Sequence, residues 1–435
     1  MDINRSTDAP YDVVIVGGRP AGASLACRLG ARGLTVLVVD KAEFPSLPEV
    51  PSCPIMYASA MAVLDEIGFH EAAYRHAATR VHSGIVGFEG FFDARLRIPF
   101  AHGRDYLYGF DRRGFDTALW NHLGSFPTVT RRAGFPVTDV VRDGTGRVIG
   151  IEGKRGERVL ARLAVIGADG RHSLVARRAQ ARVIEDQHTY TSTIHFAQWE
   201  GLAPATADGE PVLQIVSTGR GRNVLFFPSA EGRVNVATHA RSDRVQTAGD
   251  AQSYYLQQLR SLATVRCRIA GARQVGPLLG VRRIANRYLE AGGPGWLLVG
   301  DALHHKDPVD GQGIYDALVE ARHLAELLGE YAHERITWDG LVERHRQATL
   351  AETHRMFEAT MERLKRDLYT DLSPLVIKTL ARWSLQDPEY QRRFLLVLAR
   401  AMPPEGWRTP AFMARVAARG LLRDLRALMP TTAKA

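Results

Sequence analysis

The sequence predicts a mixed α/β fold with a parallel sheet at its core, because three buried strands each run directly into a glycine-containing turn. Continuous apolar runs occur at residues 11–16, 163–166 and 296–299, and such runs are typical of parallel strands covered on both faces. Helical patterning follows the first and third turns, the latter over 313–328. Strand, turn and helix in this order indicate the βα units of an α/β protein.

Two other regions have a different texture. Between the first two buried strands, 137–141, 148–152 and 158–160 have the pattern of a meander, and from 185 to 280 short alternating runs predict an antiparallel sheet with a hairpin loop at 229–233. After residue 336, amphipathic helical patterning runs nearly to the end and is broken by prolines. We predict three units: a discontinuous α/β domain (10–80, 100–184, 281–335), a β-sheet domain (81–99, 185–280) and a helical C-terminal domain (336–435).

Composition excludes several classes of protein. Of 435 residues, 45% are hydrophobic and 24% charged, as in an ordinary globular protein rather than a disordered one. The three cysteines lie far apart without a C-x-x-C pair, so we predict neither a disulfide framework nor a metal site. No apolar run approaches the ~18 residues of a membrane span, and residues 1–10 contain no hydrophobic signal core, which predicts a cytoplasmic location.

The net charge of +9 has two interpretations. A basic protein can bind nucleic acid or another anionic partner, whereas an arginine-rich composition can also follow from GC-rich coding. The basic residues are spread along the chain and form no long basic block. We therefore predict no nucleic-acid partner and keep nucleic-acid binding only as the non-enzymatic alternative.

The first glycine turn has the context of a dinucleotide-binding fingerprint. It lies between a strand and a helix whose N-terminal amides can bind a pyrophosphate, and Asp40 closes the next strand, where it can bind ribose hydroxyls. Arg19 occupies the second glycine position of G-x-G-x-x-G, so either its side chain stays clear and adds a cation, or the site is degenerate. The predicted contact residues are Gly17, Gly18, Arg19, Pro20, Ala21, Gly22, Asp40 and Lys41.

The second and third turns become informative together with the first. Asp169 and Gly170 end a strand and precede a helix start, which taken alone is a common turn. In the third turn Gly300 and Asp301 precede a polar loop, and 311–314 opens a long helix. Asp301 can bind a polyol hydroxyl, and the amides of 311–314 can face an electron-rich ring edge.

The order of the three turns, with roughly 130 to 150 residues between them, resembles the FAD-dependent monooxygenases of the aromatic-hydroxylase (p-hydroxybenzoate-hydroxylase-like) superfamily, a group that includes geranylgeranyl-reductase-like enzymes and flavin halogenases. The resemblance covers about residues 10–335 and implies a Rossmann-like FAD-binding domain with an inserted substrate sheet. It adds Arg112 as a residue leaning on the cofactor and Val137 as a residue near the adenine. The cofactor residues implied beyond the first turn are Arg112, Val137, Asp169, Gly170, Gly300, Asp301, Pro308, Gly311, Gln312, Gly313 and Ile314.

Departures from the family pattern limit the choice of substrate. Arg19 and the form of the second and third motifs are closer to the reductase-like branch, while the halogenase signature Trp-x-Trp-x-Ile-Pro is absent. No nucleophile–base triad is expected, because the cofactor carries the chemistry. The polar residues of the third loop, His304, His305 and Lys306, are candidates for handling a proton at the flavin or the substrate; the alternative is that they are solvated loop residues.

The resemblance implies an FAD-dependent monooxygenase that uses NAD(P)H and O2 to hydroxylate or epoxidise a small, largely apolar molecule, aromatic or polyketide-like, through a flavin C4a-hydroperoxide. The alternatives are a reductase of C=C bonds and a flavin-dependent halogenase. The sequence leaves open the substrate and regiochemistry, NADH or NADPH as donor, a homodimer, and a substrate delivered on a carrier protein. The C-terminal helices are interpreted as a cap or a dimer surface.

Overall fold

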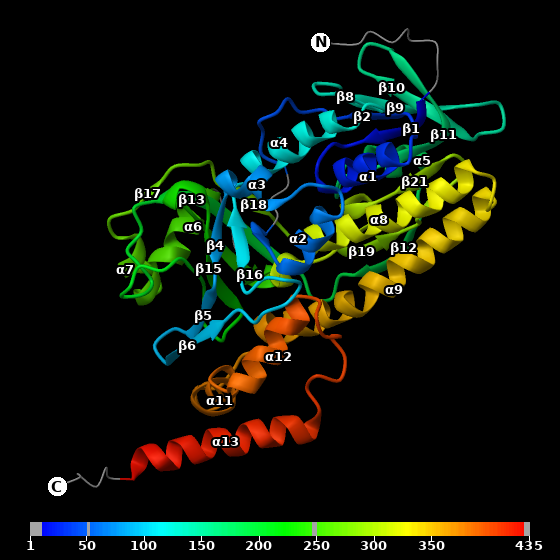
Figure 1. Cartoon of the computed structure of the whole chain (residues 1–435). Coiled ribbons are helices and arrows are strands. Elements are labelled where there is room, and N and C mark those ends of the chain that lie inside the picture. Colours follow the sequence, from blue (N-terminus) through cyan, green and yellow to red (C-terminus); the bar gives the residue numbers. More distant parts are fainter. Residues whose placement is uncertain (1–10, 50–52, 246–249, 430–435) are drawn as a thin grey trace.

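The computed structural model describes residues 11–49, 53–245 and 250–429, which form two large sheets with helices packed around them (Figure 1). The first sheet has the strand order β20-β21-β11-β1-β2-β8, with β10 on β11 and β9 on β10. Its strands are β1 (Tyr11–Val16), β2 (Val36–Val39), β8 (Val129–Arg132), β9 (Val137–Arg142), β10 (Val148–Gly153), β11 (Arg158–Gly167), β20 (Gly292–Gly293) and β21 (Trp296–Leu298).

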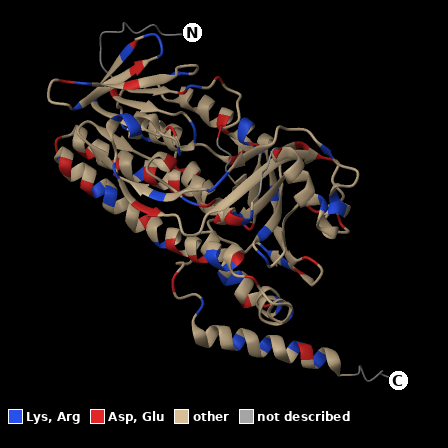
Figure 2. Ribbon diagram, turned by 180° about the vertical axis from the view of Figure 1, so that it is seen from behind, with Lys and Arg blue, Asp and Glu red and all other residues tan. Residues whose placement is uncertain are grey.

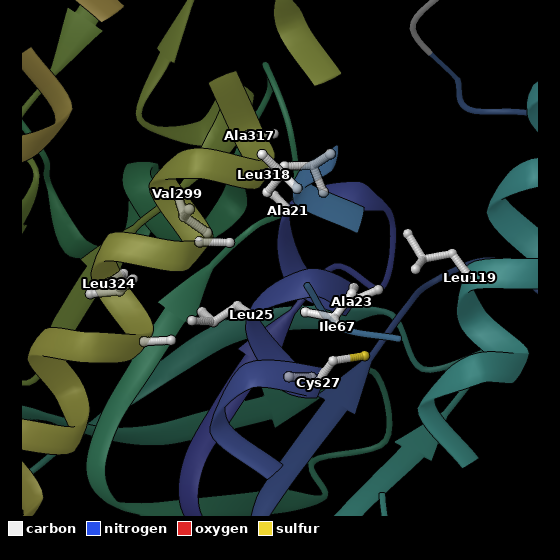
Figure 3. Close-up of a cluster of buried hydrophobic side chains, with 14 of the residues drawn as sticks. Ala21, Ala23, Leu25, Cys27, Ile67, Leu119, Val299, Ala317, Leu318 and Leu324 are labelled. Carbon is white, nitrogen blue, oxygen red and sulfur yellow. The ribbon is translucent and has the colours of Figure 1, made fainter. Parts of the chain in front are cut away.

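Helices cover both faces of the parallel part of this sheet. On one face α1 (Pro20–Ala31) packs against α8 (Gly313–Ala332), and the small side chains of Ala21 and Ala317 lie close together where the two helices meet (Figure 3). On the other face α5 (Leu174–Ala179) packs with the β9–β10 hairpin. Burial on both faces explains why β1 and β2 are continuous apolar runs.

The second sheet has the order β17-β13-β16-β15-β14-β5-β6, with β18 also on β13. It combines strands from two stretches of the chain, β5 and β6 from residues 83–97 and the others from residues 192–281. Its strands are β5 (Ser83–Phe88), β6 (Phe92–Arg97), β13 (Ser192–Glu200), β14 (Val212–Ser217), β15 (Arg222–Pro228), β16 (Val234–Arg241), β17 (Arg273–Gln274) and β18 (Leu279–Val281). One face packs on α6 (Ala251–Arg260) and α7 (Ala263–Ile269), and the other faces the rest of the molecule.

Two three-stranded sheets join the large ones. Their orders are β3-β7-β4 and β12-β19-β22. These strands are β3 (Ile55–Met56), β4 (Ala78–Val81), β7 (Leu107–Phe110), β12 (Val183–Gln187), β19 (Asn286–Leu289) and β22 (His304–His305). Short helices α2 (Ala58–Asp65), α3 (Glu71–Tyr74) and α4 (Arg112–His122) lie near the first of them.

The C-terminal part is helical. Its elements are α9 (Trp338–Leu364), α10 (Pro374–Val376), α11 (Arg382–Leu385), α12 (Pro388–Leu398) and α13 (Pro410–Leu428). Among the described residues no helix is both long and apolar enough to cross a membrane, and no cluster of three metal-ligating side chains occurs.

Most predicted elements are present, with three corrections. The predicted strands 158–160 and 163–166 are one strand, β11, which bends from the β10 hairpin into the parallel sheet. The sheet predicted as antiparallel contains one parallel pair, β14 with β5. The C-terminal prolines Pro374, Pro388 and Pro410 each begin a helix, because proline's fixed φ and missing N–H suit the first helical position. The division into three units stays a prediction. Residue 10, where the first unit is predicted to begin, lies outside the described residues, as does the whole stretch 1–10 from which the cytoplasmic location was predicted.

Candidate active site

The first glycine turn packs too tightly for larger residues. Gly17 has φ +105°, and a Cβ there would lie 2.3 Å from the Ala168 carbonyl oxygen at the end of β11. A Cβ on Gly22 would lie 1.9 Å from the Gly17 carbonyl oxygen, and one on Gly18 2.2 Å from the Trp120 ring. The N-terminus of α1 is therefore held directly against the turn, where its first amides point out of the sheet edge.

Asp40 ties this turn to the end of β2. Its carboxylate accepts hydrogen bonds from the Gly18 and Ala42 amides, both at 2.9 Å. The neighbouring Lys41 is exposed and pairs with Glu49 at 2.6 Å. Asp40 thus lies where the fingerprint needs an acidic residue, whereas Lys41 points to a surface partner.

Arg19 keeps its side chain clear of the turn. Its backbone is extended (φ −89°, ψ −167°), a conformation that does not require glycine. Its guanidinium lies 2.5 Å from Asp116 of α4 and also donates to Ser46. Arg112 donates to both oxygens of the same carboxylate, from Nε to Oδ1 at 3.0 Å and from Nη2 to Oδ2 at 2.9 Å. Arg19 and Arg112, predicted from separate motifs, therefore converge on Asp116.

The second turn is organised by Asp169. Its carboxylate accepts hydrogen bonds from the Ser173 hydroxyl at 2.5 Å and the Leu174 amide at 2.6 Å, so it fixes the start of α5, and burial raises its pKa. Gly170 follows with φ +78° and open space around it. Val137 begins β9 and is half-buried. In this structure Asp169 therefore shapes the turn by fixing the N-terminus of α5.

The third turn lies against the first. A Cβ on Gly300 would be 2.8 Å from the Ala21 Cβ of α1, and Gly300 has φ +66°. Asp301 follows, half-exposed, 3.6 Å from Arg171 of the second turn. The three turns, far apart in sequence, therefore meet at one sheet edge. Beside the second and third turns lies a cavity lined by Arg171, Gly300, Asp301, Pro308, Gly311, Gly313 and Ile314.

This cavity contains unsatisfied donors that fit an anionic dinucleotide such as FAD. Arg171 is nearly buried, yet its Nε and Nη1 have no hydrogen-bond partner among the described residues. Helix α8 begins at the cavity edge without a side-chain cap, and α1, whose Ala21 lies against Gly300, also begins without one, whereas Thr337 caps α9. Buried donors without partners are costly, so a bound anion would relieve the cost. The residues present fit the pyrophosphate and ribityl parts of FAD.

His304 and Lys306 are buried, so the solvated-loop alternative is wrong. His304 Nδ1 lies 2.6 Å from Glu320 Oε1 and its Nε2 3.6 Å from Asp316, both on α8. Lys306 pairs with Asp316, whose other oxygen is 2.6 Å from Arg400. Burial lowers the pKa of His304, but Glu320 and Asp316 outweigh it and raise that pKa to about 9. The two side chains border the cavity and belong to an ion network beneath it.

His305 has a different environment. It is buried, and its Nδ1 lies 3.1 Å from the Asp301 carbonyl oxygen. Burial, with nearby Arg171, lowers its pKa to about 4, so its ring is neutral near pH 7. A role for His304, His305 or Lys306 in catalysis stays a prediction.

An apolar cavity adjoins the third loop. Alternating residues of three neighbouring strands form its wall: Ile194 and Phe196 on β13, Leu225 and Phe227 on β15, and Asn235, Ala237 and His239 on β16. Pro308 and Val309 of the loop form its other side. This cavity is narrow, with a volume of about 20 Å³, and it shares Pro54, Phe196 and Asn235 with a second cavity of about 290 Å³. Of the aromatic residues on β13 and β15, Phe196 and Phe227 line the cavities, whereas Trp199 and Phe226 pack under α6 and α7.

One polar side chain on this wall, His239, was not among the predicted site residues. His239 Nε2 lies 3.1 Å from Asp307 Oδ1, and Ser192 donates to the other oxygen of Asp307. All three side chains are buried, and Asn286 accepts the Asp307 amide hydrogen at 2.7 Å. Burial would raise the pKa of Asp307, but His239 and Ser192 hold it below its ordinary value. The sequence does contain one indication of this position. His239, Ala237 and Asn235 alternate along β16 and therefore lie on the same face of the strand.

Comparison with known proteins identifies the family. Residues 10–353 match the family described as FAD binding domain, which is most of the chain. The chain belongs to this FAD-binding family. It is 28% identical over 335 residues to the ubiquinone hydroxylase UbiL of Rhodospirillum rubrum, covering 75% of this chain and 74% of the relative. It is 25% identical over 352 residues to the menaquinone reductase of Mycolicibacterium smegmatis, covering 77% and 80%.

The fold also resembles that of solved flavoenzymes. The flavin-dependent brominase Bmp2 superposes with a TM-score of 0.76 at 18% identity, covering 97% of this chain and all of the brominase. These findings confirm the predicted α/β fold, the predicted family resemblance and FAD as cofactor, and identify the protein as an FAD-dependent oxidoreductase. The individual FAD contacts stay predictions.

Proposed function

We propose that this flavoprotein is a single-component monooxygenase that uses NAD(P)H and O2 to hydroxylate or epoxidise a small, largely apolar substrate. The observation that carries the proposal is the apolar wall of β13, β15 and β16 opposite Pro308–Val309. Its narrow cavity adjoins the FAD cavity at Cys53 and Pro308, and it adjoins the cavity of about 290 Å³, which is large enough for a small substrate, at Phe196 and Asn235. A relative named as a ubiquinone hydroxylase supports a hydroxylating reaction on an apolar ring. We infer a phenol or quinol as the substrate class.

The chain's own residues divide the work of such a reaction. FAD, when bound, supplies the electron transfer to oxygen. Arg171 and the first amides of α1 and α8 would hold its phosphates, and Asp301 would accept ribityl hydroxyls. The apolar wall would keep water out of the substrate cavity, through Phe196, Leu225 and Phe227. Excluding water limits the side reactions of reactive intermediates.

His239 is the group we assign to proton transfer at the substrate. It is a polar ring on an otherwise mostly apolar wall, and Asp307 fixes its orientation through Nε2. A substrate hydroxyl in the cavity would give its proton to the His239 ring. The phenolate formed in this way donates electron density to the substrate ring carbon that is to be hydroxylated. Asp307 would stabilise the imidazolium that results.

Oxygen dependence tests the proposal. The purified holoenzyme is reduced with NADH or NADPH and supplied with phenols and quinols, with air and without it. A monooxygenase forms product only with air, and product then matches NAD(P)H consumed. Product formed without oxygen and carrying two added hydrogens would contradict the proposal.

A reductase of C=C bonds is the second candidate. The relative named as a menaquinone reductase, and others named as digeranylgeranylglycerophospholipid reductases at 24–26% identity, favour it. The same anaerobic experiment identifies it, because a reductase continues without oxygen. For the halogenase alternative, which the similarity to the brominase fold keeps open, the readout is a bromide-dependent product mass.

A further inference from the structure

Helix α13 has one face that anchors it to the protein. Phe412, Val416 and Gly420 are buried on this face, and a Cβ on Gly420 would lie 2.1 Å from the Trp383 ring atom Cγ. Figure 1 shows α13 at the edge of the molecule, next to α11 and α12 and far from the parallel sheet. These contacts attach α13 to the periphery of the molecule.

Five large apolar residues at the C-terminal end of α13, the last of them directly after the helix, face solvent. Leu421, Leu422 and Leu425 are about half exposed, and Leu428 and Met429 are exposed by 80% and 69%. At about 100° per residue these five side chains fall within one arc of about 120°. We call this arc, residues 421, 422, 425, 428 and 429, the leucine face. Leu375 and Leu380, on the adjacent segment 374–381 that contacts α13, are also exposed.

Positive charge borders the leucine face. Arg415 and Arg426 are exposed, and no carboxylate of the described residues pairs with either. Asp424, the only acidic residue of α13, is already paired with Arg382 at 2.6 Å. Figure 2 shows the basic residues spaced along this helix. The uncompensated charge beside the leucine face is therefore cationic.

We propose that α13 binds the surface of an anionic lipid membrane. An exposed apolar arc bordered by arginines is the pattern of a helix that lies in the plane of a membrane interface, with its leucines in the acyl boundary and its cations at the headgroups. A second copy of this chain fits less well, because pairing two leucine faces would bring arginines of both copies together without a carboxylate. The proposal is independent of the reaction catalysed.

Vesicle co-sedimentation of the full-length holoenzyme tests this proposal. Wild-type protein is mixed with vesicles of phosphatidylglycerol and phosphatidylcholine, and with vesicles of phosphatidylcholine alone, at low and high salt. We expect binding to the anionic vesicles that weakens at high salt, because the arginines contribute by screened attraction. The double variant L421E/L425E should lower partitioning at least about tenfold, since it places charge in the acyl boundary.

Matched variants separate this effect from a general one. V183E/I184E adds the same charge at two exposed apolar positions of β12 and should bind like wild type. R415Q/R426Q leaves the leucines intact and should lose the difference between anionic and neutral vesicles. Flavin absorbance of each variant reports that the holoenzyme is folded.

Two results would overturn the proposal. One is wild-type protein that stays in the supernatant with anionic vesicles at low salt. The other is a dimer, seen by light scattering, that L421E/L425E dissociates while vesicle binding is unchanged, since α13 would then be an interface between copies.

Discussion

At the residue scale, Asp307 joins the two halves of the candidate site. It lies in the loop that follows β22, one residue before Pro308, and its carboxylate holds His239 and Ser192 of the substrate sheet. Residue types alone could not reveal this arrangement, because His239 and Asp307 are 68 positions apart and only the packing of two sheets brings them together. The first glycine turn and the place of Asp40 at the end of β2 were predictable, since both follow from the strand–turn–helix–strand pattern of one short stretch of chain.

Replacing His239 tests its assignment to proton transfer. We expect H239Q to lower kcat about a hundredfold with KM nearly unchanged and to flatten the pH profile of kcat, because glutamine keeps the bond to Asp307 but cannot accept the proton. His195 lies on the opposite face of the same sheet, so H195Q is the matched control. If both variants retain the wild-type pH profile, His239 is structural.

Arg171 provides a test of the cofactor site. We expect R171A to weaken FAD binding by about 2 kcal/mol, about 30-fold in Kd, because it removes charge-assisted hydrogen bonds to the cofactor. Flavin fluorescence titration of the apoprotein measures this Kd. Arg177, exposed on α5, is the control; equal Kd values for R171A and R177A would place Arg171 outside the FAD site.

At the element scale, the junction of α1 and α8 positions the site. Gly300 sits between these helices and links the first and third turns. The sequence predicts both helices and their strands because each is a continuous apolar or amphipathic run. It could not predict that 158–160 and 163–166 form one strand, because Arg162 interrupts the apolar pattern. Nor could it predict that His304 and Lys306 point to carboxylates of α8 rather than to solvent.

Substituting Gly300 tests this junction. G300A places a Cβ 2.8 Å from Ala21 at φ +66°, so we expect the free energy of unfolding to fall by about 1–3 kcal/mol and FAD affinity to fall with it. Urea denaturation measures the first quantity. G144A, at an open position of the β9–β10 hairpin, is the control and should change neither.

At the scale of the whole molecule, buried charges tie the C-terminal helices to the FAD-binding part. Asp316 of α8 contacts both Lys306 and Arg400, and Arg400 also donates to Gln312 at 2.8 Å. Burial would raise the pKa of Asp316, but Lys306 and Arg400 lower it. Two of the chain's basic residues, Lys306 and Arg400, are thus buried in ion pairs and are not part of an exposed basic surface.

This network makes stability depend on pH. Because the pKa of His304 is raised to about 9, its charged form stabilises the fold fully below its unfolded pKa of about 6.5, and that contribution is lost as pH rises through about 9. We expect the Tm of the wild type to fall over this window more steeply than that of H304Q/E320Q, which lacks the pair. Parallel pH profiles of Tm would show that His304 does not titrate with folding.

We propose that oxygen is inserted into the substrate at the two adjoining cavities beside the loop that contains Pro308 and Val309. Product mass after turnover under heavy-isotope O2 in ordinary water tests it most directly, with wild type and H239Q run on the same phenols and quinols. We expect one labelled oxygen atom in the wild-type product and far less labelled product from H239Q. Product without label, with oxygen from water or with only added hydrogens, would contradict it.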